Sequence, residues 1–313
     1  MLTYNFDTCG FRLCAGPKVN ISGKTKLFGI IGDPVSHSLS PLFQNRFLEE
    51  RGIDAAYVPF HIRKIDVAKA LEGLWAVGVE GFNVTVPHKE VVLHMVEADA
   101  DAKCIGAVNT VIRHTEGWQG TNTDWQGFRD VLRGMEVDVS GAEVLLFGAG
   151  GTARAVLHAL AQEKAAKVSV CNRGQGRLHT FIGHARETYP KLAVEVVAWN
   201  QEAVGEACER AVLIVNSTSI GLRNEAEHFP FQLPGDGVAL DAVYAQNGDT
   251  AFVCVAEQSG HKVLDGLPML LAQGAASFYY WHQIEPARTF AMHWLEAQLG
   301  REPADLPGWE NTV

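Results

Sequence analysis

The chain has 313 residues, enough for two domains, because single hydrophobic cores rarely grow beyond about 250–300 residues. Hydrophobic residues make up 47% and charged residues 20%, a globular composition, and the net charge of −10 without long basic runs argues against binding nucleic acid. The N-terminal residues lack the pattern of a signal peptide, and no window of about 18 residues is uninterruptedly apolar, so we expect a cytoplasmic protein that does not bind membranes.

The first half of the chain alternates short apolar runs with runs of helical period from Lys26 onward. This alternation is typical of α/β units around a largely parallel sheet. Ser40 and Pro41 stand where an N-cap and a first helical residue are expected. Residues 107–124 break the pattern and predict a hairpin over Glu116 and Gly117. In chain order we expect strands at 26–32, 55–62 and 81–87, each followed by a helix, at 40–52, 65–78 and 89–96.

A second α/β run follows a helix expected at 125–135. It opens with a strand, a glycine-rich turn and a helix over residues 142–162. Because the motif type changes near residues 128–141, we expect a domain boundary there. Further strands are expected within residues 166–174, 192–199, 211–219, 237–244 and 261–266, and two helices at 268–283 and 286–300.

The run VLLFGAGGTARA places small residues between an apolar strand and a helix: Gly148, Gly150, Gly151 and Ala153. The first glycine permits a tight turn, and the next lets the backbone approach a pyrophosphate. The small Ala153 lets helix and strand pack closely, and the helix N-terminus offers free N–H groups to the anion. This context favours a dinucleotide site over a turn that serves packing alone.

The loop after the next strand bears on the choice of nucleotide. An NAD site usually carries an acid about 20 residues after the turn, but this loop supplies Asn172, Arg173 and Arg177. Two guanidinium groups suit a 2′-phosphate, so NADP is favoured. The alternative that both arginines are only solvated loop residues stays open at this point.

Polar side chains gather where the apolar strands of the first half end. In a parallel α/β sheet these carboxyl ends face one crevice. Hydroxyls and amides with one lysine and one aspartate make a site for a small polyhydroxylated acid. The residues are Ser38, Ser40, Asn83, Thr85, Lys89, Asn109 and Asp124.

Lys89 also stands against local preference, because a cation is disfavoured at the helix N-terminus where the sequence places it. Such departures are expected mainly at functional sites. Metal ligation is not expected, since the six cysteines form no C-x-x-C pair and the twelve histidines show no H-E-x-x-H spacing.

Nine motifs together resemble the family of shikimate dehydrogenases and quinate/shikimate dehydrogenases. They occur in family order across roughly residues 27–285: GDPVSHSLSP, GFNVTVPHK, GAVNT, GTNTDWQG, GAGGTARA, CNR, NSTSIGL, DAVY and DGLPMLLAQGA. The resemblance implies NADP-dependent, reversible reduction of 3-dehydroshikimate to shikimate in aromatic amino-acid biosynthesis. Monomers and homodimers both occur in the family.

The resemblance also implies an architecture and a set of site residues. We expect an N-terminal α/β substrate-binding domain (1–127 with 268–313, residues 1–25 an extension), a Rossmann-like domain with a parallel sheet (128–267), and a cleft between them. Lys89 and Asp124 would be the catalytic pair. Substrate would be held by Ser38, Ser40 and Tyr244 at its carboxylate and by Asn83, Thr85, Asn109, Asp124 and Gln273 at its ring hydroxyls. Cofactor would lie against Gly148, Ala149, Gly150, Gly151, Thr152, Ala153, Asn172, Arg173, Arg177, Ser217, Thr218, Ser219 and Gly266.

Four residues depart from the family pattern. Gln44 stands where histidine is frequent, and Gly174 where biosynthetic enzymes usually have a threonine that helps to hold the 2′-phosphate. Gln246 replaces the usual proline, and Pro268 precedes the methionine of the last motif. The sequence therefore leaves open NAD as cofactor, quinate or a related ring acid as substrate, and a non-catalytic nucleotide sensor as a further alternative.

Overall fold

The computed structural model describes residues 21–221, 228–245, 248–304 and 306–310. Most of the expected extension at 1–25 and the departure at Gln246 lie outside these residues. No helix in the described part of the chain is long and apolar enough to cross a membrane. The four cysteines within it, Cys104, Cys171, Cys208 and Cys254, are free thiols.

The N-terminal half folds into a mixed six-stranded sheet in the order β2-β1-β3-β5-β6-β4. The first three strands of this order run parallel, and the expected hairpin forms as the antiparallel pair β5 and β6. Its strands are β1 (Lys26–Gly32), β2 (Ala55–His61), β3 (Val79–Val84), β4 (Glu97–Ala98), β5 (Thr110–His114) and β6 (Gly117–Thr121). Its connections carry α1 (Ser40–Glu50), η1 (Lys64–Asp66), α2 (Val67–Ala76), α3 (Lys89–Val92), η2 (Leu93–Met95) and α4 (Ala100–Ile105).

The second half folds into a six-stranded sheet that is parallel throughout, in the order β12-β11-β10-β7-β8-β9. Strand order reverses between β7 and β10, which is the switch point where α/β sheets bind ligands. Its strands are β7 (Glu143–Phe147), β8 (Lys167–Cys171), β9 (Ala193–Val197), β10 (Leu213–Asn216), β11 (Val238–Asp241) and β12 (Lys262–Leu264). Its helices are α6 (Gly151–Gln162), α7 (Gln175–Thr188), α8 (Gln201–Arg210) and α9 (Ala251–Gln258).

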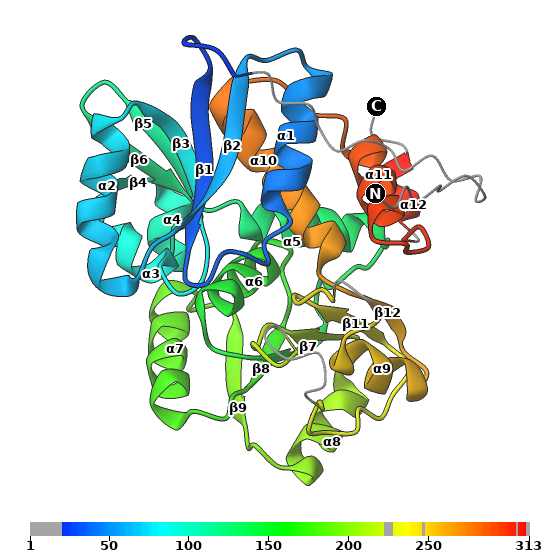
Figure 1. Ribbon diagram of the computed structural model, residues 1–313. Coiled ribbons are helices and arrows are strands. Elements are labelled where there is room, and N and C mark those ends of the chain that lie inside the picture. The colour runs from blue at the N-terminus through cyan, green and yellow to red at the C-terminus, as the bar shows by residue number, and fades with distance from the viewer. Residues whose placement is uncertain (1–20, 222–227, 246–247, 305, 311–313) are drawn as a thin grey trace, which may run out of the picture.

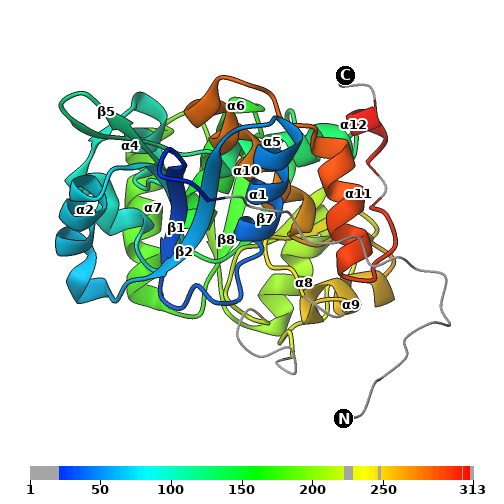
Figure 2. The same ribbon diagram turned by 45° about the horizontal axis from the view of Figure 1, so that its top comes forward.

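Four further helices are α5 (Asp124–Gly134), α10 (Leu267–His282), α11 (Arg288–Gln298) and α12 (Pro307–Glu310). Figures 1 and 2 show α5, α6 and α10 in the middle of the molecule, where α5 contacts both α6 and α10. The predicted boundary between residues 127 and 128 falls inside α5, and α10 begins next to the boundary at 268. The division into two domains at these residues stays a prediction.

One hydrophobic core is shared by the two halves of the fold. Phe43 of α1 belongs to the same buried cluster as Leu146 of β7, together with Phe128 of α5 and Phe278 of α10. Within β7, alternate residues face opposite sides, so Leu146 enters the shared core while Phe147 packs under α8 and α9. A third cluster lies between the first sheet and α2. This shared core holds the carboxyl ends of both sheets close to each other.

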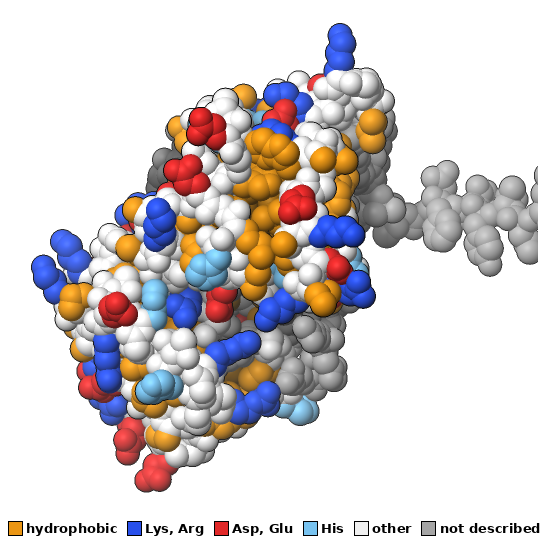
Figure 3. Space-filling model, turned by 90° about the vertical axis from the view of Figure 1, so that its left-hand side faces the viewer, with side chains coloured by type: hydrophobic (Ala, Val, Ile, Leu, Met, Phe, Trp, Pro, Cys, Tyr) orange, Lys and Arg blue, Asp and Glu red, His pale blue; other side chains and the backbone are white. Residues whose placement is uncertain are grey.

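The surface over the left-hand side of Figure 1 is mixed in charge. Figure 3 shows lysine and arginine interspersed with aspartate and glutamate on this face, with hydrophobic side chains gathered in a band over its upper half. This face therefore presents no continuous basic area.

Candidate active site

Lys89 and Asp124 form a buried ion pair at the carboxyl edge of the first sheet. The Nζ of Lys89 lies 2.6 Å from Oδ2 of Asp124, and the two side chains are 13% and 7% exposed. Lys89 is the first residue of α3 and Asp124 the first of α5, so the carboxylate takes a position that a helix dipole favours and the ammonium one that it disfavours. The carboxylate offsets the unfavourable placement of the cation.

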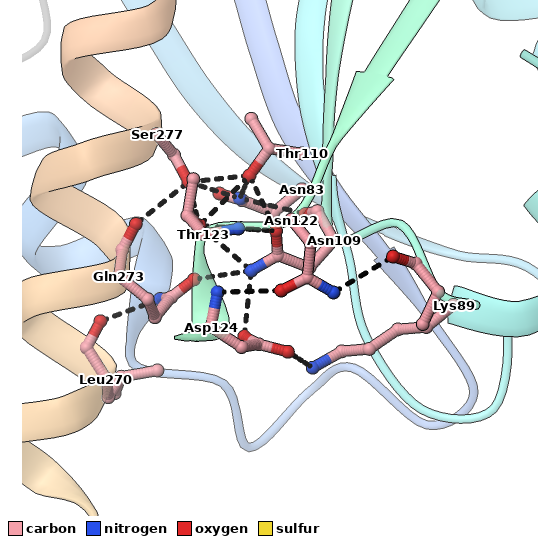
Figure 4. Close-up of polar contacts among 11 residues, drawn as sticks. Asn83, Lys89, Asn109, Thr110, Asn122, Thr123, Asp124, Leu270, Gln273 and Ser277 are labelled. Atoms are coloured by element: carbon pink, nitrogen blue, oxygen red, sulfur yellow. Dashed lines mark hydrogen bonds and ion pairs between the residues drawn. The ribbon is translucent and has the colours of Figure 1, made fainter. Parts of the chain in front are cut away.

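The amide of Asn109 connects Asp124 to α10. Its Oδ1 accepts a hydrogen bond from the backbone N–H of Thr123 (2.7 Å). Because a backbone N–H can only donate, this bond sets the orientation of the amide. Nδ2 therefore faces the carboxylate and donates to Asp124 Oδ1 (2.8 Å) and to Oε1 of Gln273 (3.2 Å). Figure 4 shows these side chains converging from the first sheet, α5 and α10.

Behind this group lies a buried layer of hydroxyls and amides that sequence reasoning did not single out, apart from Asn83. Asn83 Nδ2 donates to Ser277 Oγ (2.9 Å) and Thr110 Oγ1 (3.2 Å), and its Oδ1 accepts from Tyr57 Oη (2.7 Å). Because its amide already bonds to protein atoms, Asn83 supports the site from behind, and a direct bond to substrate stays a prediction. Ser277 lies one helical turn after Gln273 on α10.

Asn122 and Thr123 belong to the same layer. Asn122 Oδ1 accepts from the backbone N–H of Asp124 (3.0 Å), and Nδ2 donates to the carbonyl of Ala107 (2.9 Å). Thr123 Oγ1 lies 3.0 Å from Ser277 Oγ and accepts from Asn109 Nδ2 at 2.9 Å. Their signal in the sequence is their place in the NTD motif directly before Asp124.

The predicted carboxylate subsite draws on both halves of the chain. The hydroxyl of Tyr244, which follows β11, lies 3.4 Å from the backbone nitrogen of Leu39 and 3.5 Å from the carbonyl of His37. Tyr244 therefore flanks the partly exposed Ser38. Ser40 is buried and is the first residue of α1. The sequence predicted Ser40 as the N-cap, but that position belongs to Leu39. Its backbone N–H donates to Ser38 Oγ (3.3 Å), so Ser38 satisfies the helix start.

Three other predicted features have clear places. Thr85 follows the end of β3 and is partly exposed, with its methyl group against Gly32. Gln44 is buried and donates to the carbonyl of Gly274 (2.8 Å), which ties α1 to the helix that carries Gln273. Pro268 lies in the first turn of α10, where proline is tolerated.

The glycine-rich turn adjoins the ion pair. Gly148 has φ +110°, and a Cβ added there would lie 2.5 Å from Ser217 Oγ, so only glycine fits. A Cβ added at Gly150 would meet open space, which leaves room for a ligand. A Cβ added at Gly151 would lie 3.6 Å from Cβ and Cδ of Lys89. The turn thus brings the free N–H groups at the start of α6 beside the lysine, which fits a dinucleotide.

The remaining cofactor candidates follow the carboxyl ends of other strands of the second sheet. Arg173 is exposed on the loop after β8, and Arg177 is exposed in the first turn of α7. Asn172 Nδ2 donates to the carbonyl of Gly174 (2.9 Å) and closes that loop. The segment of Ser217, Thr218 and Ser219 follows β10, and Gly266 precedes α10, where a Cβ would lie 2.5 Å from the carbonyl oxygen of Ala242.

A parallel α/β sheet with a glycine-rich turn, set against a buried lysine–carboxylate pair, defines a nucleotide-dependent dehydrogenase of the α/β class. Comparisons with known proteins identify the branch of that class. The family model described as "Shikimate dehydrogenase substrate binding domain" matches residues 30–111.

The relatives agree with this match over nearly the whole chain. A shikimate dehydrogenase (NADP(+)) of Synechocystis sp. is 38% identical over 88% of this chain and 98% of its own length. The crystal structure of the Aquifex aeolicus shikimate dehydrogenase has TM-score 0.79 and 38% identity, covering 88% of this chain and 99% of that one. The Thermus thermophilus enzyme, solved in complex with NADP(H) and shikimate, has TM-score 0.75 and 32% identity over 88% of this chain and 100% of its own. The chain belongs to the shikimate dehydrogenase family.

Proposed function

We propose that this protein is an NADP-dependent shikimate dehydrogenase that reversibly reduces 3-dehydroshikimate to shikimate. One observation carries the proposal: the Lys89–Asp124 pair lies directly against the glycine-rich turn, with the place of a Gly151 Cβ only 3.6 Å from the lysine side chain. A proton-transfer group and a dinucleotide turn must adjoin, because oxidation of a secondary alcohol moves a hydride from its carbon to the nicotinamide and a proton from its hydroxyl oxygen to a base.

In this proposal Lys89 takes the proton of the reacting hydroxyl during oxidation and returns it during reduction. Asp124 orients the ammonium group and accepts a hydrogen bond from a neighbouring hydroxyl. Asn109 holds the Asp124 carboxylate through its Nδ2 and also bonds Gln273. Asp124, Asn109 and Gln273 thus form a row of polar side chains that would face the substrate ring. Both amides are oriented by protein contacts, so the row is preorganised for hydroxyl recognition.

The other substrate contacts serve the carboxylate and the remaining hydroxyls. Ser38, Ser40 and Tyr244 would hold the carboxylate, since the Tyr244 hydroxyl lies 3.4 Å from the backbone nitrogen of Leu39, the residue between the two serines. Thr85 would bond a ring hydroxyl from the end of β3. Asn83, whose amide is already engaged, would act on the same hydroxyls from behind.

NADP, when bound, accepts or supplies the hydride. The start of α6 and the glycines of its turn would bind the pyrophosphate. Arg173 and Arg177 would bind the 2′-phosphate, because both are exposed, Arg173 on the loop after β8 and Arg177 in the first turn of α7 that follows it. Asn172, the segment 217–219 and Gly266 would complete the nucleotide site.

The proposal also covers the domain organisation, the oligomeric state, the partners and the cellular location of the protein. Residues 1–127 with 268–313 form the substrate domain, and residues 128–267 form the nucleotide domain. The protein is a monomer or a homodimer that binds small molecules, neither nucleic acid nor membranes. It is cytoplasmic, which suits the four free thiols of the described chain.

An assay grid tests this function. The purified protein is mixed with shikimate or quinate and with NADP or NAD, and reduced nicotinamide is followed at 340 nm. We expect the highest kcat/KM with shikimate and NADP. A preference for quinate or for NAD would instead identify a quinate/shikimate enzyme, and no turnover with tight nucleotide binding would identify a sensor.

A neutral ketose belongs in the same assay. A 5-ketofructose reductase of Gluconobacter sp. has TM-score 0.76 and 27% identity to this chain. We expect no turnover of 5-ketofructose with NADPH here, because Ser38, Ser40 and Tyr244 are proposed to bind a ring carboxylate that this ketose lacks. Efficient reduction of that ketose would overturn the assignment of a ring acid.

A further inference from the structure

The buried carboxylate of Asp241 lies between two loops of the proposed site, and none of the roles proposed above includes it. Asp241 ends β11 and pairs in register with Asn216, which ends β10. Its side chain is almost fully buried, with only 3% of the residue exposed. Oδ1 accepts from Asn216 Nδ2 (2.9 Å) and from the backbone N–H of Val243 (2.9 Å), and Oδ2 accepts from Thr250 Oγ1 (2.6 Å).

One branch of this network leads to the proposed nucleotide site. Asn216, held by Asp241, accepts at its own Oδ1 from Oγ1 (2.7 Å) and the backbone N–H (3.1 Å) of Thr218. The adjacent Ser217 donates from Oγ to the carbonyl of Phe147 (2.7 Å), and its hydroxyl lies against Gly148. Asp241 therefore connects to the segment 217–219 through one intervening amide, beside the bond from the backbone N–H of Ser217 to the carbonyl of Phe147 (2.8 Å).

The other branch leads to the proposed substrate carboxylate. The bond from Val243 N–H to Asp241 sets the direction of the chain that continues to Tyr244. The carbonyl of Val243 also accepts from the backbone N–H of Gly266 (2.9 Å), so the backbone of Val243 is held at both its N–H and its carbonyl. Three residues beyond Asp241, the Tyr244 hydroxyl reaches Leu39 and His37 beside Ser38.

The network tolerates either charge state of the carboxylate. Burial is the main cause that raises the pKa of Asp241 to about 7, and the nearby Asp265 adds to it against the three hydrogen bonds. When protonated at Oδ2, Asp241 donates to Thr250 Oγ1, and Oδ1 still accepts both N–H groups. An asparagine amide in the same orientation makes the same three bonds, whereas alanine makes none.

We propose that Asp241 is a positioning residue that sets the nucleotide segment 217–219 and the substrate-side Tyr244 from a single buried point. The inference rests on the proposed function for the identity of the two ligands. Loss of the carboxylate would then weaken the binding of both nucleotide and substrate, although Asp241 itself contacts neither ligand in this proposal.

Three variants separate the two branches. Asn216→Ala removes only the branch to Thr218, Tyr244→Phe only the substrate end, and Asp241→Ala both. We expect Asp241→Ala to raise the Kd of NADPH, measured by titration calorimetry, and the KM of shikimate, each by about tenfold or more, since one buried charged hydrogen bond contributes about that much. Asn216→Ala should raise the Kd alone and Tyr244→Phe the KM alone. Asp241→Asn should restore both constants to within about threefold of the wild-type values.

A buried carboxylate outside the two branches provides the matched control. Glu296 on α11 is 2% exposed and accepts from the backbone N–H of Ala304 (2.7 Å). Glu296→Ala should lower Tm without changing either constant. The proposal is overturned if Asp241→Ala changes only one constant, if Glu296→Ala changes both as much, or if Asp241→Asn fails to restore them.

The calorimetric measurement needs no turnover. Wild-type protein that binds NADPH but does not oxidise shikimate would refute the proposed function, while the nucleotide branch could still be measured. If Asp241→Ala does not fold, the single-branch variants still decide: the proposal fails if Asn216→Ala leaves the NADPH Kd unchanged.

Discussion

Lys89 carries the proposed proton transfer, and its replacement by methionine tests the mechanism most directly. Methionine keeps the length of the stem and removes the ammonium group. We expect kcat for shikimate oxidation to fall by about 10²–10⁴, which corresponds to roughly 3–5 kcal/mol of activation free energy. Lys89→Arg should not rescue turnover, because a guanidinium group does not release its proton near neutral pH.

The structure predicts a second effect of the same substitution, on stability. Asp124 is 7% exposed, and its Oδ2 would lose a partner at 2.6 Å while Oδ1 keeps the bond from Asn109. Breaking a buried pair by removing one partner costs about 3–5 kcal/mol. Because Lys89 is 13% exposed and one bond to Asp124 remains, we expect the free energy of unfolding to fall by about 3 kcal/mol or less.

A double substitution separates the two effects. Lys89→Met with Asp124→Asn removes both charges, so urea unfolding should show a higher free energy of unfolding than Lys89→Met alone, while turnover stays low. The assay is kcat at saturating shikimate and NADP beside urea denaturation followed by tryptophan fluorescence. Near-wild-type kcat in Lys89→Met, or recovery of kcat in the double variant, would refute the assigned role of Lys89.

Three further predictions concern the cofactor and pH. Arg173→Ala should weaken NADP binding by more than about tenfold and leave NAD nearly unchanged; equal losses in calorimetry would contradict the 2′-phosphate assignment. Gly174→Thr should strengthen NADP binding by about threefold without changing NAD, since φ of −87° accepts any residue and an added Cβ meets only Asn172 Nδ2, at 3.6 Å; an unchanged Kd for NADP would contradict it. The pKa of Asp241 is raised from 3.8 to about 7, so the folded state keeps this proton at pH values where the unfolded state has lost it. The free energy of unfolding of the wild type should therefore fall relative to that of Asp241→Asn from about pH 4 to pH 7 and then level off. At about 1.4 kcal/mol for each pH unit, the ceiling of this fall is on the order of 4 kcal/mol; parallel urea-unfolding free energies at pH 5 and pH 8 would contradict it.

The amino-acid sequence was sufficient to predict much of the chain's secondary structure. The parallel strands, the hairpin at β5 and β6 and the helix that begins at Lys89 follow from local periodicity and turn residues. The glycine-rich turn was equally clear, because its spacing between strand and helix is itself the signal. The start of α1 was predicted one residue too late: Ser40 was expected to be the N-cap, but it is the first helical residue. The backbone N–H of Ser40 donates to Ser38 Oγ, so Ser38 takes the capping role that was expected of Ser40.

The buried polar layer behind the ion pair was less accessible from the sequence. Ser277 lies in an apolar helix and Thr110 at a strand start, and neither residue type distinguishes a ligand-supporting hydroxyl from an ordinary one. Their function appears only when α10 packs on the first sheet and brings Ser277 Oγ 2.8 Å from Thr110 Oγ1. Asn83 shows the same limit, because its partners are 27 and 194 residues away along the chain.

By itself, the sequence determined the parallel strands, the hairpin, the nucleotide turn and the exceptional lysine at a helix start, because each depends on residues within a few positions of one another. The helices α4, α7, α8 and α9 were not predicted. Tertiary structure decided which side chains face one another: Lys89 with Asp124, Tyr244 with the loop before α1, and Asp241 between two loops. Hydrogen-bond partners and burial depend on residues that are far apart in the chain and are brought together by the shared core, so no local sequence pattern predicts them.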